Sequence, residues 1–251
     1  MSRLLTLQKA LAAIIPAAKL VETNLPLRLS GPIHASGPAQ SLRPAQSSEL
    51  AHPSKSALPP LKLYLLDGDY PQGELAPEEV QRVMNNPLYW VFCWASGQVV
   101  AQQILANPQW VRGKRILDFG SGCGVVGIAA ALAGAHEVIA CDIDPLALQA
   151  TALNARLNGA PITLTADYYS IEGDVDLIVV ADVLYDSSNF PWLERFAERA
   201  ERVLIADSRV KNFDLPPYQQ IGREYSCTLP DLDESEQFRD VRLYEAVRAL
   251  R

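Results

Sequence analysis

The stretch Ile116-Leu-Asp-Phe-Gly-Ser-Gly-Cys-Gly-Val-Val-Gly127 decides the fold. Its first four residues belong to a short apolar run typical of a buried strand, and its last residues begin a run of small apolar residues, 125–135, typical of a helix. Gly120, Gly122 and Gly124 lie between the two. Glycines there permit a sharp turn and let a ligand approach the backbone closely. The stretch therefore predicts a buried strand, a ligand-binding loop and a helix, in that order.

Strands and helices alternate on the C-terminal side of this stretch. The helix that begins at Asp144-Pro145 has a capping residue followed by a proline suited to its first turn. We predict an α/β fold with a doubly wound, Rossmann-like, mostly parallel sheet of seven strands and helices on both faces. The last two strands alternate apolar and polar residues, which predicts antiparallel edge strands. The predicted strands cover 115–119, 137–141, 162–165, 175–181, 203–206, 219–227 and 241–247, and the helices cover 125–135, 145–157 and 191–200.

The chain divides into three segments of different composition. Residues 1–25 hold an amphipathic helix over 4–20, whose leucines and isoleucines recur at helical spacing and need a partner surface. Residues 26–60 contain seven prolines and seven serines, which predicts a linker or insertion because such a segment cannot bury enough apolar area to offset its chain entropy. Residues 61–251 form the main domain, which begins with a strand over 61–66 and helices over 77–85 and 97–107.

The overall composition argues against several classes of protein. The chain has 251 residues, a net charge of −7 and no dense basic run, so we expect no nucleic-acid partner. It has no apolar run of 18 residues, so we expect no membrane span. Its four cysteines, Cys93, Cys123, Cys141 and Cys227, form no C-x-x-C pair. This favours reduced thiols in a cytoplasmic protein, without a metal site.

The glycine loop fits two cofactors. A nicotinamide dinucleotide fits because Gly122, Gly124 and Gly127 match the G-x-G-x-x-G fingerprint. Asp142 lies 20 residues after Gly122, where such proteins place an acid that binds the ribose. S-adenosylmethionine fits as well, since it also has a ribose but carries a sulfonium and an ammonium and has no phosphate.

The charges around the loop separate these two cofactors. Asp118 ends the first strand of the stretch, Asp182 ends the neighbouring strand of such a sheet, and the loop holds no lysine or arginine. A pyrophosphate beside both carboxylates would be repelled at a cost on the order of 1 kcal/mol or more, whereas a cationic methyl donor would be stabilised. The sequence therefore favours a methyltransferase over a nicotinamide-dependent oxidoreductase.

Four motifs in order resemble those of a known family. Asp118-Phe-Gly-Ser-Gly-Cys-Gly124 resembles motif I of the class I (seven-β-strand) S-adenosylmethionine-dependent methyltransferases, and Val138-Ile-Ala-Cys-Asp-Ile-Asp-Pro145 resembles their next motif. Ala181-Asp-Val-Leu-Tyr185 resembles the Asp-x-x-Tyr motif of the protein-lysine branch. Tyr89-Trp-Val-Phe-Cys-Trp-Ala-Ser-Gly-Gln98 resembles the segment before the glycine loop in the lysine methyltransferases of the electron-transfer-flavoprotein β subunit. The resemblance covers about 61–250, and the proline- and serine-rich segment departs from it.

This resemblance implies how one end of the donor would be bound. Gly120, Gly122 and Gly124 would line its methionine part, and Asp118 would hold its ammonium, directly or through water. Asp142 would accept hydrogen bonds from both ribose hydroxyls, although the same residue could simply terminate a strand.

The resemblance also implies the residues around the adenine. Asp167 would meet the adenine amino group, although it could instead be a turn residue. Tyr168 or Ile143 would pack on the ring. Trp94 would close the donor pocket from the N-terminal side, unless it belongs to the core.

Asp182 and Tyr185 are the candidate catalytic residues. They lie three residues apart after the fourth strand, at the sheet edge where ligands bind. Asp182 could hold and orient an incoming amine, and Tyr185 could contribute a hydroxyl or a ring wall; alternatively, Asp182 makes a strand-end hydrogen bond to a neighbouring loop. We expect an N-methyltransferase acting on a protein lysine, possibly in the flavoprotein β subunit. The alternatives are a small amine or a nicotinamide-like ring nitrogen and, less favoured, an oxidoreductase.

Overall fold

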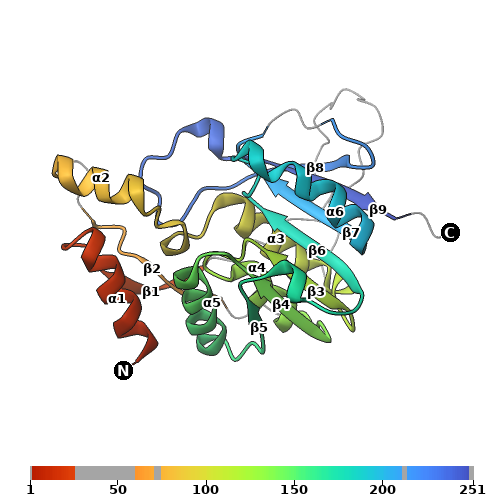
Figure 1. Ribbon diagram of the computed structural model, residues 1–251, viewed down its shortest axis with the longest axis horizontal. Helices are drawn as coiled ribbons and strands as arrows, with labels where there is room; N and C mark the ends of the chain where they lie inside the picture. The colour runs from red at the N-terminus through yellow and green to blue at the C-terminus, as the bar shows by residue number, and fades with distance from the viewer. Residues whose placement is uncertain (1, 26–59, 71–74, 211–213, 249–251) are drawn as a thin grey trace, which may run out of the picture.

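The computed structural model describes residues 2–25, 60–70, 75–210 and 214–248. Its main feature is a seven-stranded sheet in the order β5-β4-β3-β6-β7-β9-β8, which lies at the centre and right of Figure 1. The predicted seven-stranded α/β architecture is confirmed. The strands are β3 (Arg115–Phe119), β4 (Glu137–Cys141), β5 (Thr163–Thr165), β6 (Val175–Ala181), β7 (Ala200–Asp207), β8 (Gln219–Tyr225) and β9 (Asp240–Val247).

The direction of the last strand sets this sheet apart from a dinucleotide-binding sheet. β3 to β7 run parallel to one another, whereas β9 lies between β7 and β8 and is antiparallel to both. The dinucleotide-binding order is 3-2-1-4-5-6, without such an inserted strand. The prediction that both late strands lie at an edge was wrong for β9. Its apolar residues are buried because their side chains point into the clusters on the two sides of the sheet. Val241 and Leu243 belong to the cluster on the α4 side, and Tyr244 belongs to the cluster on the α6 side.

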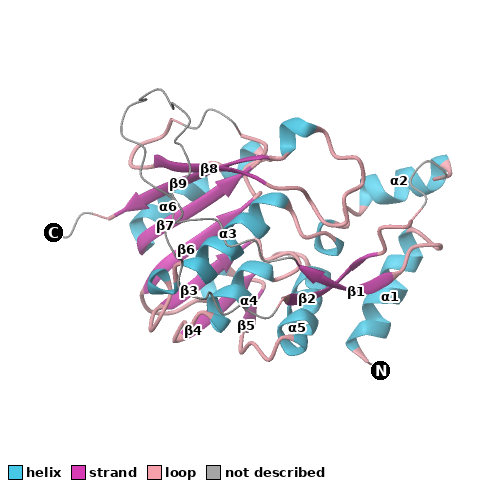
Figure 2. Ribbon diagram, turned by 180° about the vertical axis from the view of Figure 1, so that it is seen from behind, coloured by secondary structure: helices cyan, strands magenta, loops and turns pink. Residues whose placement is uncertain are grey.

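Helices cover both faces of the sheet, as predicted. α3 (Ala95–Ala106), α4 (Val125–Leu132) and part of α5 (Pro145–Leu157) pack on one face, and α6 (Pro191–Arg199) packs on the other. Figures 1 and 2 show the two sides of this arrangement. Neighbouring residues of one strand serve opposite faces, so that Ile116 belongs to the α4 side and Leu117 to the α6 side. This packing holds the carboxyl ends of the parallel strands in one row.

The N-terminal segment packs on the domain itself. α1 (Arg3–Ile14) buries Leu7 and Leu11 in a cluster that includes residues of α5, so its apolar stripe has a partner within the chain. β1 (Leu20–Leu25) pairs antiparallel with β2 (Leu61–Leu66). The predicted helix over 4–20 was too long: α1 ends at Ile14, because the residue before Pro16 is disfavoured in a helix. The segment 26–60, predicted as a linker, lies outside the described residues except for its last one.

Other boundaries differ by a few residues. α2 (Pro77–Asn85) matches its prediction, whereas α3 begins at Ala95, two residues before the expected start. α4 ends at Leu132 and not at 135, because Gly134 has a φ of +93° that a helix does not accommodate. In the described part of the chain, no helix has the length and apolar character needed to cross a membrane.

Candidate active site

The glycine loop begins where β3 ends and wraps over the end of β4. The Gly120 amide donates to the Cys141 carbonyl oxygen at 2.8 Å, and the Gly124 amide donates to that of Ser121 at 2.7 Å. All three glycines have positive φ, as the glycine-rich turn predicts. A Cβ at Gly120 would come within 2.6 Å of Val183, and one at Gly124 within 2.9 Å of Thr151. The loop is therefore held in a form that only glycine permits.

Gly122 differs from the other two glycines because its α-carbon faces open space. A Cβ there would meet no atom closer than the Gly120 carbonyl oxygen at 4.0 Å. Its amide donates to Asp142 Oδ2 at 2.9 Å, so the loop is tied to the end of β4. Gly122 is thus the point at which a ligand could approach the loop backbone most closely.

Asp142 holds two backbone amides and keeps further acceptor capacity. Its Oδ2 accepts from Gly122 and its Oδ1 accepts from the Asp144 amide at 2.9 Å. Asp144 in turn caps α5 by accepting from the Leu146 amide, as predicted. Burial raises the pKa of Asp142, while these two amide hydrogen bonds oppose the rise. A carboxylate can accept about four hydrogen bonds, so positions remain for a pair of ligand hydroxyls.

Asp118 is the most deeply buried carboxyl group on this side of the site. It is 2% exposed, and its Oδ2 accepts from the Gly127 amide at 2.9 Å. Burial raises its pKa to about 7; the Gly127 hydrogen bond opposes the rise, and the nearby charge of Asp142 adds to it. A cation placed beside Asp118 would relieve the cost of its buried charge.

A small hollow brings Asp118 and the glycine loop together with Trp94. It has a volume of about 30 Å³, room for only a small group, so most of a larger ligand would lie along the open strand edge. None of its lining residues is a lysine or an arginine. The Trp94 indole Nε1 donates to the Tyr89 carbonyl oxygen at 3.0 Å, which orients the ring. The residues that line the hollow are Trp94, Gly97, Asp118, Gly120, Ser121, Gly122, Cys123, Val125, Val126 and Ala181.

The residues predicted to surround an adenine lie in different environments. Ile143 is 88% exposed at the edge and is free to cover a ring. Tyr168 is buried and packs against Phe119 and Phe196 on the α6 side of the sheet, so Ile143 is the more accessible of the two residues predicted to pack on an adenine. Asp167 is exposed, and its Oδ1 accepts from the Tyr169 amide at 2.9 Å as a cap of the short turn that follows β5. It is a turn residue with acceptor capacity left.

Asp182 lies at the end of β6, and serines from two other elements surround its carboxylate. Ser96 at the start of α3 donates through its amide to Oδ2 at 3.1 Å and through its hydroxyl to Oδ1 at 2.8 Å. Ser208, after β7, donates through its amide at 2.9 Å and its hydroxyl at 2.7 Å, both to Oδ1. Asp182 itself has a φ of +50°, a conformation that costs a non-glycine residue about 1–3 kcal/mol. The four hydrogen bonds hold this strained residue in place. They agree with the alternative interpretation of the sequence, in which Asp182 forms hydrogen bonds to neighbouring segments at the end of its strand.

Asp207 at the end of β7 was missed by the sequence reasoning. It is fully buried and accepts from the amides of Leu184, Arg209 and Val210 at 3.3, 2.7 and 2.7 Å. Burial, then the charge of Asp182, raises its pKa to about 6. Asp207 could have been predicted from the sequence, because it ends an apolar strand in the same way as Asp118. Nothing in the sequence pattern indicates that Ser96 and Ser208 are the hydrogen-bond partners of Asp182, because only the folded chain brings the three residues together.

Tyr185 lies at the surface beside a second tyrosine. Its ring centroid is 5.4 Å from that of Tyr89, which in turn is 6.0 Å from that of Trp94. Burial of its hydroxyl raises the pKa of Tyr185 to about 12, with further contributions from a hydrogen bond to Tyr89 and from the charges of Asp186 and Asp142. Tyr89 begins one of the four motifs, but its residue type gave no indication that it lies at the site.

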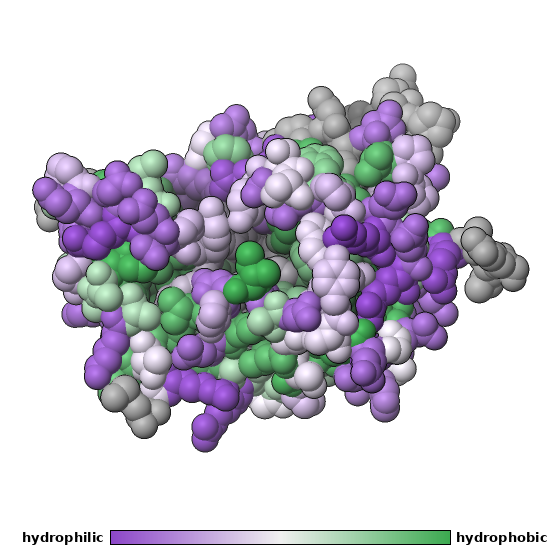
Figure 3. Space-filling view, viewed as in Figure 1, coloured by the Kyte–Doolittle hydropathy of each residue, from purple (hydrophilic) through white to green (hydrophobic). Residues whose placement is uncertain are grey.

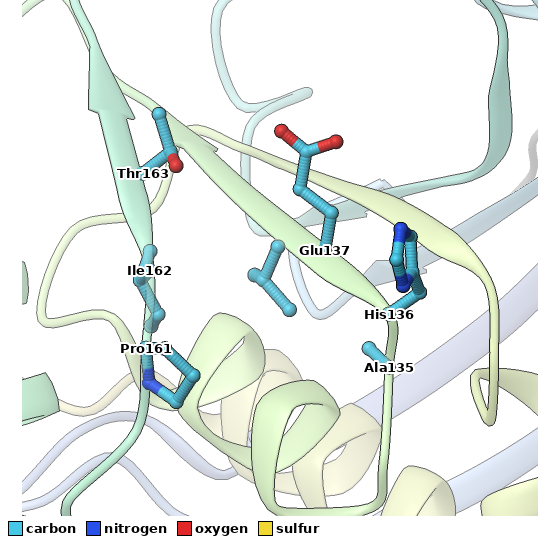
Figure 4. A pocket seen from close by; sticks show the side chains of 7 residues that line it. Ala135, His136, Glu137, Pro161, Ile162 and Thr163 are labelled. Carbon is cyan, nitrogen blue, oxygen red and sulfur yellow. The ribbon is translucent and has the colours of Figure 1, made fainter.

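A larger hollow lies at the opposite edge of the sheet. Its volume is about 350 Å³, and it opens between the amino ends of β4 and β5, far from the glycine loop. Figure 4 shows His136 and Glu137 on one side and Pro161, Ile162 and Thr163 on the other. Ligands of open α/β sheets bind outside the carboxyl ends of the strands. The candidate site is therefore the smaller hollow at the glycine loop.

This chain is similar to several known proteins. A family model described as ribosomal protein L11 methyltransferase (PrmA) matches residues 103–209. The electron transfer flavoprotein beta subunit lysine methyltransferase of Mus musculus is 42% identical over 157 residues, which cover 59% of this chain and 62% of that protein. The Danio rerio protein of the same name is 35% identical over 159 residues, covering 60% and 62%. The magnesium protoporphyrin IX methyltransferase of Synechocystis, solved with bound SAH, has a TM-score of 0.48 at 18% identity, covering 72% of this chain and 91% of that one.

In its sequence and in the residues of its glycine loop, this chain is similar to S-adenosylmethionine-dependent methyltransferases, and the family model covers less than half of its length. Within that class its sequence is similar to the electron-transfer-flavoprotein β-subunit lysine methyltransferases. The matches span less than two thirds of the length of these relatives.

Proposed function

We propose that this chain transfers a methyl group from S-adenosylmethionine to the side-chain amine of a protein lysine, as the names of its relatives suggest for the flavoprotein β subunit. The observation that carries the proposal is the pairing of a glycine loop with the carboxylates of Asp118 and Asp142 and with no cationic side chain lining the hollow. Such a site stabilises a cation and repels a pyrophosphate. The free cysteines of the described residues fit a reducing compartment, and we propose the cytoplasm.

The residues at the loop fit the parts of this donor. The open side of Gly122 leaves room for the methionine chain against the backbone. Asp118 would hold the ammonium, and Asp142 would accept from the ribose hydroxyls beside the amides that it already holds. Ile143 would cover the adenine and Asp167 would meet its amino group, while Trp94 would close the methionine end. When bound, the donor supplies a methyl group already activated by its sulfonium charge.

The chain's own part in the chemistry is to position the acceptor amine and to exclude water. The amine must be neutral to attack, whereas the ordinary pKa of a lysine is about 10.4. The ring of Tyr185 would line one side of the path along which the acceptor amine reaches the methyl group. Asp182 would act through its place at the end of β6, where it fixes the backbone that leads to Tyr185. A direct contact of its Oδ2 with the amine remains part of the proposal, since that oxygen accepts only one of the four hydrogen bonds.

A small aromatic amine is the second candidate acceptor. The half-exposed rings of Tyr89 and Tyr185 would stack on a pyridine as well as on an alkyl chain. The protein acceptor is preferred because the matching family model and both of the named curated relatives describe enzymes that act on proteins.

The proposal is tested by incubating the full chain with methyl-labelled S-adenosylmethionine and the isolated flavoprotein β subunit. A parallel reaction contains nicotinamide in place of the protein. We expect label in the β-subunit band, recovered as methyl-lysine after hydrolysis. Label only in the nicotinamide reaction would replace the protein acceptor by a small molecule. Absence of label in both reactions and in a whole-cell extract would overturn the proposed activity.

A further inference from the structure

Three aromatic side chains form a continuous row of ring contacts that begins at the candidate site. Trp94 lines the hollow beside the glycine loop, Tyr89 contacts Trp94, and Tyr185 contacts Tyr89 from the end of β6. Tyr89 belongs to the short turn Tyr89–Val91, far from Tyr185 in the sequence. Two separate parts of the fold thus supply one continuous aromatic surface, which we call the aromatic arc.

The contacts that orient the rings of the arc leave the two tyrosine rings partly exposed to solvent. Trp94 is oriented through the backbone carbonyl of Tyr89, and the ring of Tyr185 packs against that of Tyr89 with the two centroids 5.4 Å apart. Tyr89 and Tyr185 remain 45% and 53% exposed. Exposed apolar groups arranged together often mark binding sites. On the face seen in Figure 3, exposed apolar side chains also interrupt the hydrophilic surface between its two ends.

The electrostatic surroundings of the arc favour a cation. The charges of Asp142 and Asp186 act on the Tyr185 hydroxyl, and Asp182 lies three residues before it. Arg209 lies 5.6 Å from the Trp94 ring, but it is paired with Glu234 at 2.6 Å and stacked on Phe238. The face of an aromatic ring attracts an alkylammonium ion by about 0.5–2 kcal/mol.

We propose that the aromatic arc is the passage for the acceptor side chain and that Tyr89 is its specificity-determining residue, selecting an alkylammonium side chain. The inference rests on the proposed function for its acceptor. Tyr89 and Tyr185 would line the aliphatic stem of a lysine, and their ring faces would hold the ammonium that remains after a methyl group is added. Aromatic faces bind methylated ammonium ions well, since the attraction needs no N–H donor. Loss of Tyr89 should therefore weaken the second and third transfers more than the first.

Three substitutions test this role. Tyr89→Ala removes the ring but keeps the backbone carbonyl that orients Trp94, and the exposed position makes loss of the fold unexpected. Tyr89→Phe keeps the ring without the hydroxyl. Tyr225→Ala is the matched control, because it removes a tyrosine that is 68% exposed on β8.

The first measurement uses the flavoprotein β subunit as acceptor and mass spectrometry of the product. For Tyr89→Ala we expect KM for the acceptor to rise about tenfold and the ratio of di- and trimethyl to monomethyl product to fall about fivefold. The affinity for S-adenosylhomocysteine should not change. Tyr225→Ala should stay within about twofold of the wild type, and Tyr89→Phe, which keeps the ring, should restore most of the KM and product ratio lost in Tyr89→Ala. If the wild type methylates the β subunit and Tyr89→Ala does so with the same KM and product ratio, the role of Tyr89 is refuted.

The second measurement does not depend on turnover. Free Nε-trimethyl-lysine and norleucine, its uncharged counterpart, are titrated into the protein with S-adenosylhomocysteine present, and binding is followed by calorimetry. We expect the wild type and Tyr89→Phe to bind the cation at least fivefold more tightly than norleucine, and Tyr89→Ala to lose that preference. This result together with an inactive wild type would overturn the proposed methyl transfer and leave the cation-binding arc standing. Equal binding of both probes by the wild type would overturn the arc.

Discussion

The carboxylates at the ends of β3 and β4 and the carboxylate at the end of β6 lie along one edge, but their hydrogen bonding differs. Asp118 is almost fully buried and accepts from a single amide, and burial raises its pKa to about 7. Asp182 is only half-buried and accepts four hydrogen bonds from Ser96 and Ser208. We call the first region, with the glycine loop, the donor half, and the second, with the aromatic arc, the acceptor half.

This difference indicates which charge is available to a ligand. Among the described residues no cation pairs with the buried Asp118, so an incoming ammonium would stabilise its charge, whereas the N–H and O–H donors around Asp182 leave mainly its Oδ2 for a ligand. A carboxylate at a strand end can thus either bind a ligand or hold neighbouring loops. The sequence pattern is the same in both cases, and only the hydrogen-bond partners distinguish the two roles.

The largest effect is expected from Gly124→Ala in the donor half. Gly124 has a φ of +83°, and a Cβ there would lie 2.9 Å from Thr151. We expect a loss of about 2–4 kcal/mol in the free energy of unfolding and no measurable affinity for S-adenosylhomocysteine, because the loop must shift. Gly113→Ala is the control: Gly113 has a φ of +71° but no atom within 4 Å of an added Cβ. It should cost about 1 kcal/mol and leave binding unchanged. Equal effects of the two variants in urea unfolding and calorimetry would contradict the tight packing of the loop.

Asp182→Ala is expected to have the next largest effect, in the acceptor half. The variant leaves the buried amides of Ser96 and Ser208 without an acceptor and places alanine at a left-handed φ, so we expect a stability loss of about 2–3 kcal/mol. Turnover should fall by at least about 100-fold, because the backbone before Tyr185 moves, while donor affinity stays the same. Full activity in this variant would remove Asp182 from the mechanism.

The double variant Ser96→Ala/Ser208→Ala extends this test by keeping the carboxylate and removing two of its four donors. A fall in kcat with an unchanged pH profile would identify Asp182 as a positioning residue. Unchanged kcat would exclude a positioning role for these two hydroxyl donors.

The pH dependence of donor binding is the smallest expected effect and concerns Asp118. Its pKa of about 7 in the free protein should fall when an ammonium binds beside it, so binding releases a proton below pH 7. Affinity should therefore rise about fivefold to tenfold from pH 6 to pH 7 and level off above it. Asp118→Asn should bind weakly at all these pH values, without the rise. A wild-type profile that is flat between pH 6 and 8 would exclude Asp118 from ammonium binding.

The same substitution should also change stability. The pKa of Asp118 is higher in the folded than in the unfolded protein, so the donor-free protein loses stability as the pH rises from about 4 to about 7. We expect Asp118→Asn to raise the free energy of unfolding at pH 8 by at least about 1 kcal/mol, since one pKa unit corresponds to about 1.4 kcal/mol.

The sequence predicted the parts of the molecule that depend on local patterns. The glycine loop, the buried strands β3, β4 and β6 and the proline-capped α5 follow from periodicity, turn residues and capping within a few positions. β1 was missed, because its half-buried residues acquire a strand partner only from β2, on the far side of the segment 26–60. Local propensity carries no information on such a partner.

The candidate site was predictable to a similar degree. The strand-end carboxylates could be read from the sequence, because each follows an apolar run. Tyr168 and its neighbour Tyr169 could not be told apart by residue type, although the first is buried and the second is 65% exposed. The serine partners of Asp182 are 86 and 26 residues away from it, so only the assembled sheet edge brings them together.

The position of β9 between β7 and β8 also bears on how the sheet assembles during synthesis. β8 emerges from the ribosome first but has no neighbour in the sheet except β9, which follows it. Until residues 240–247 arrive, β7 presents an open edge of buried, apolar residues. Such an edge is a template for pairing with other chains. A chain that lacks residues 240–247 would therefore have the donor half in place and an unprotected, aggregation-prone strand beside the acceptor half.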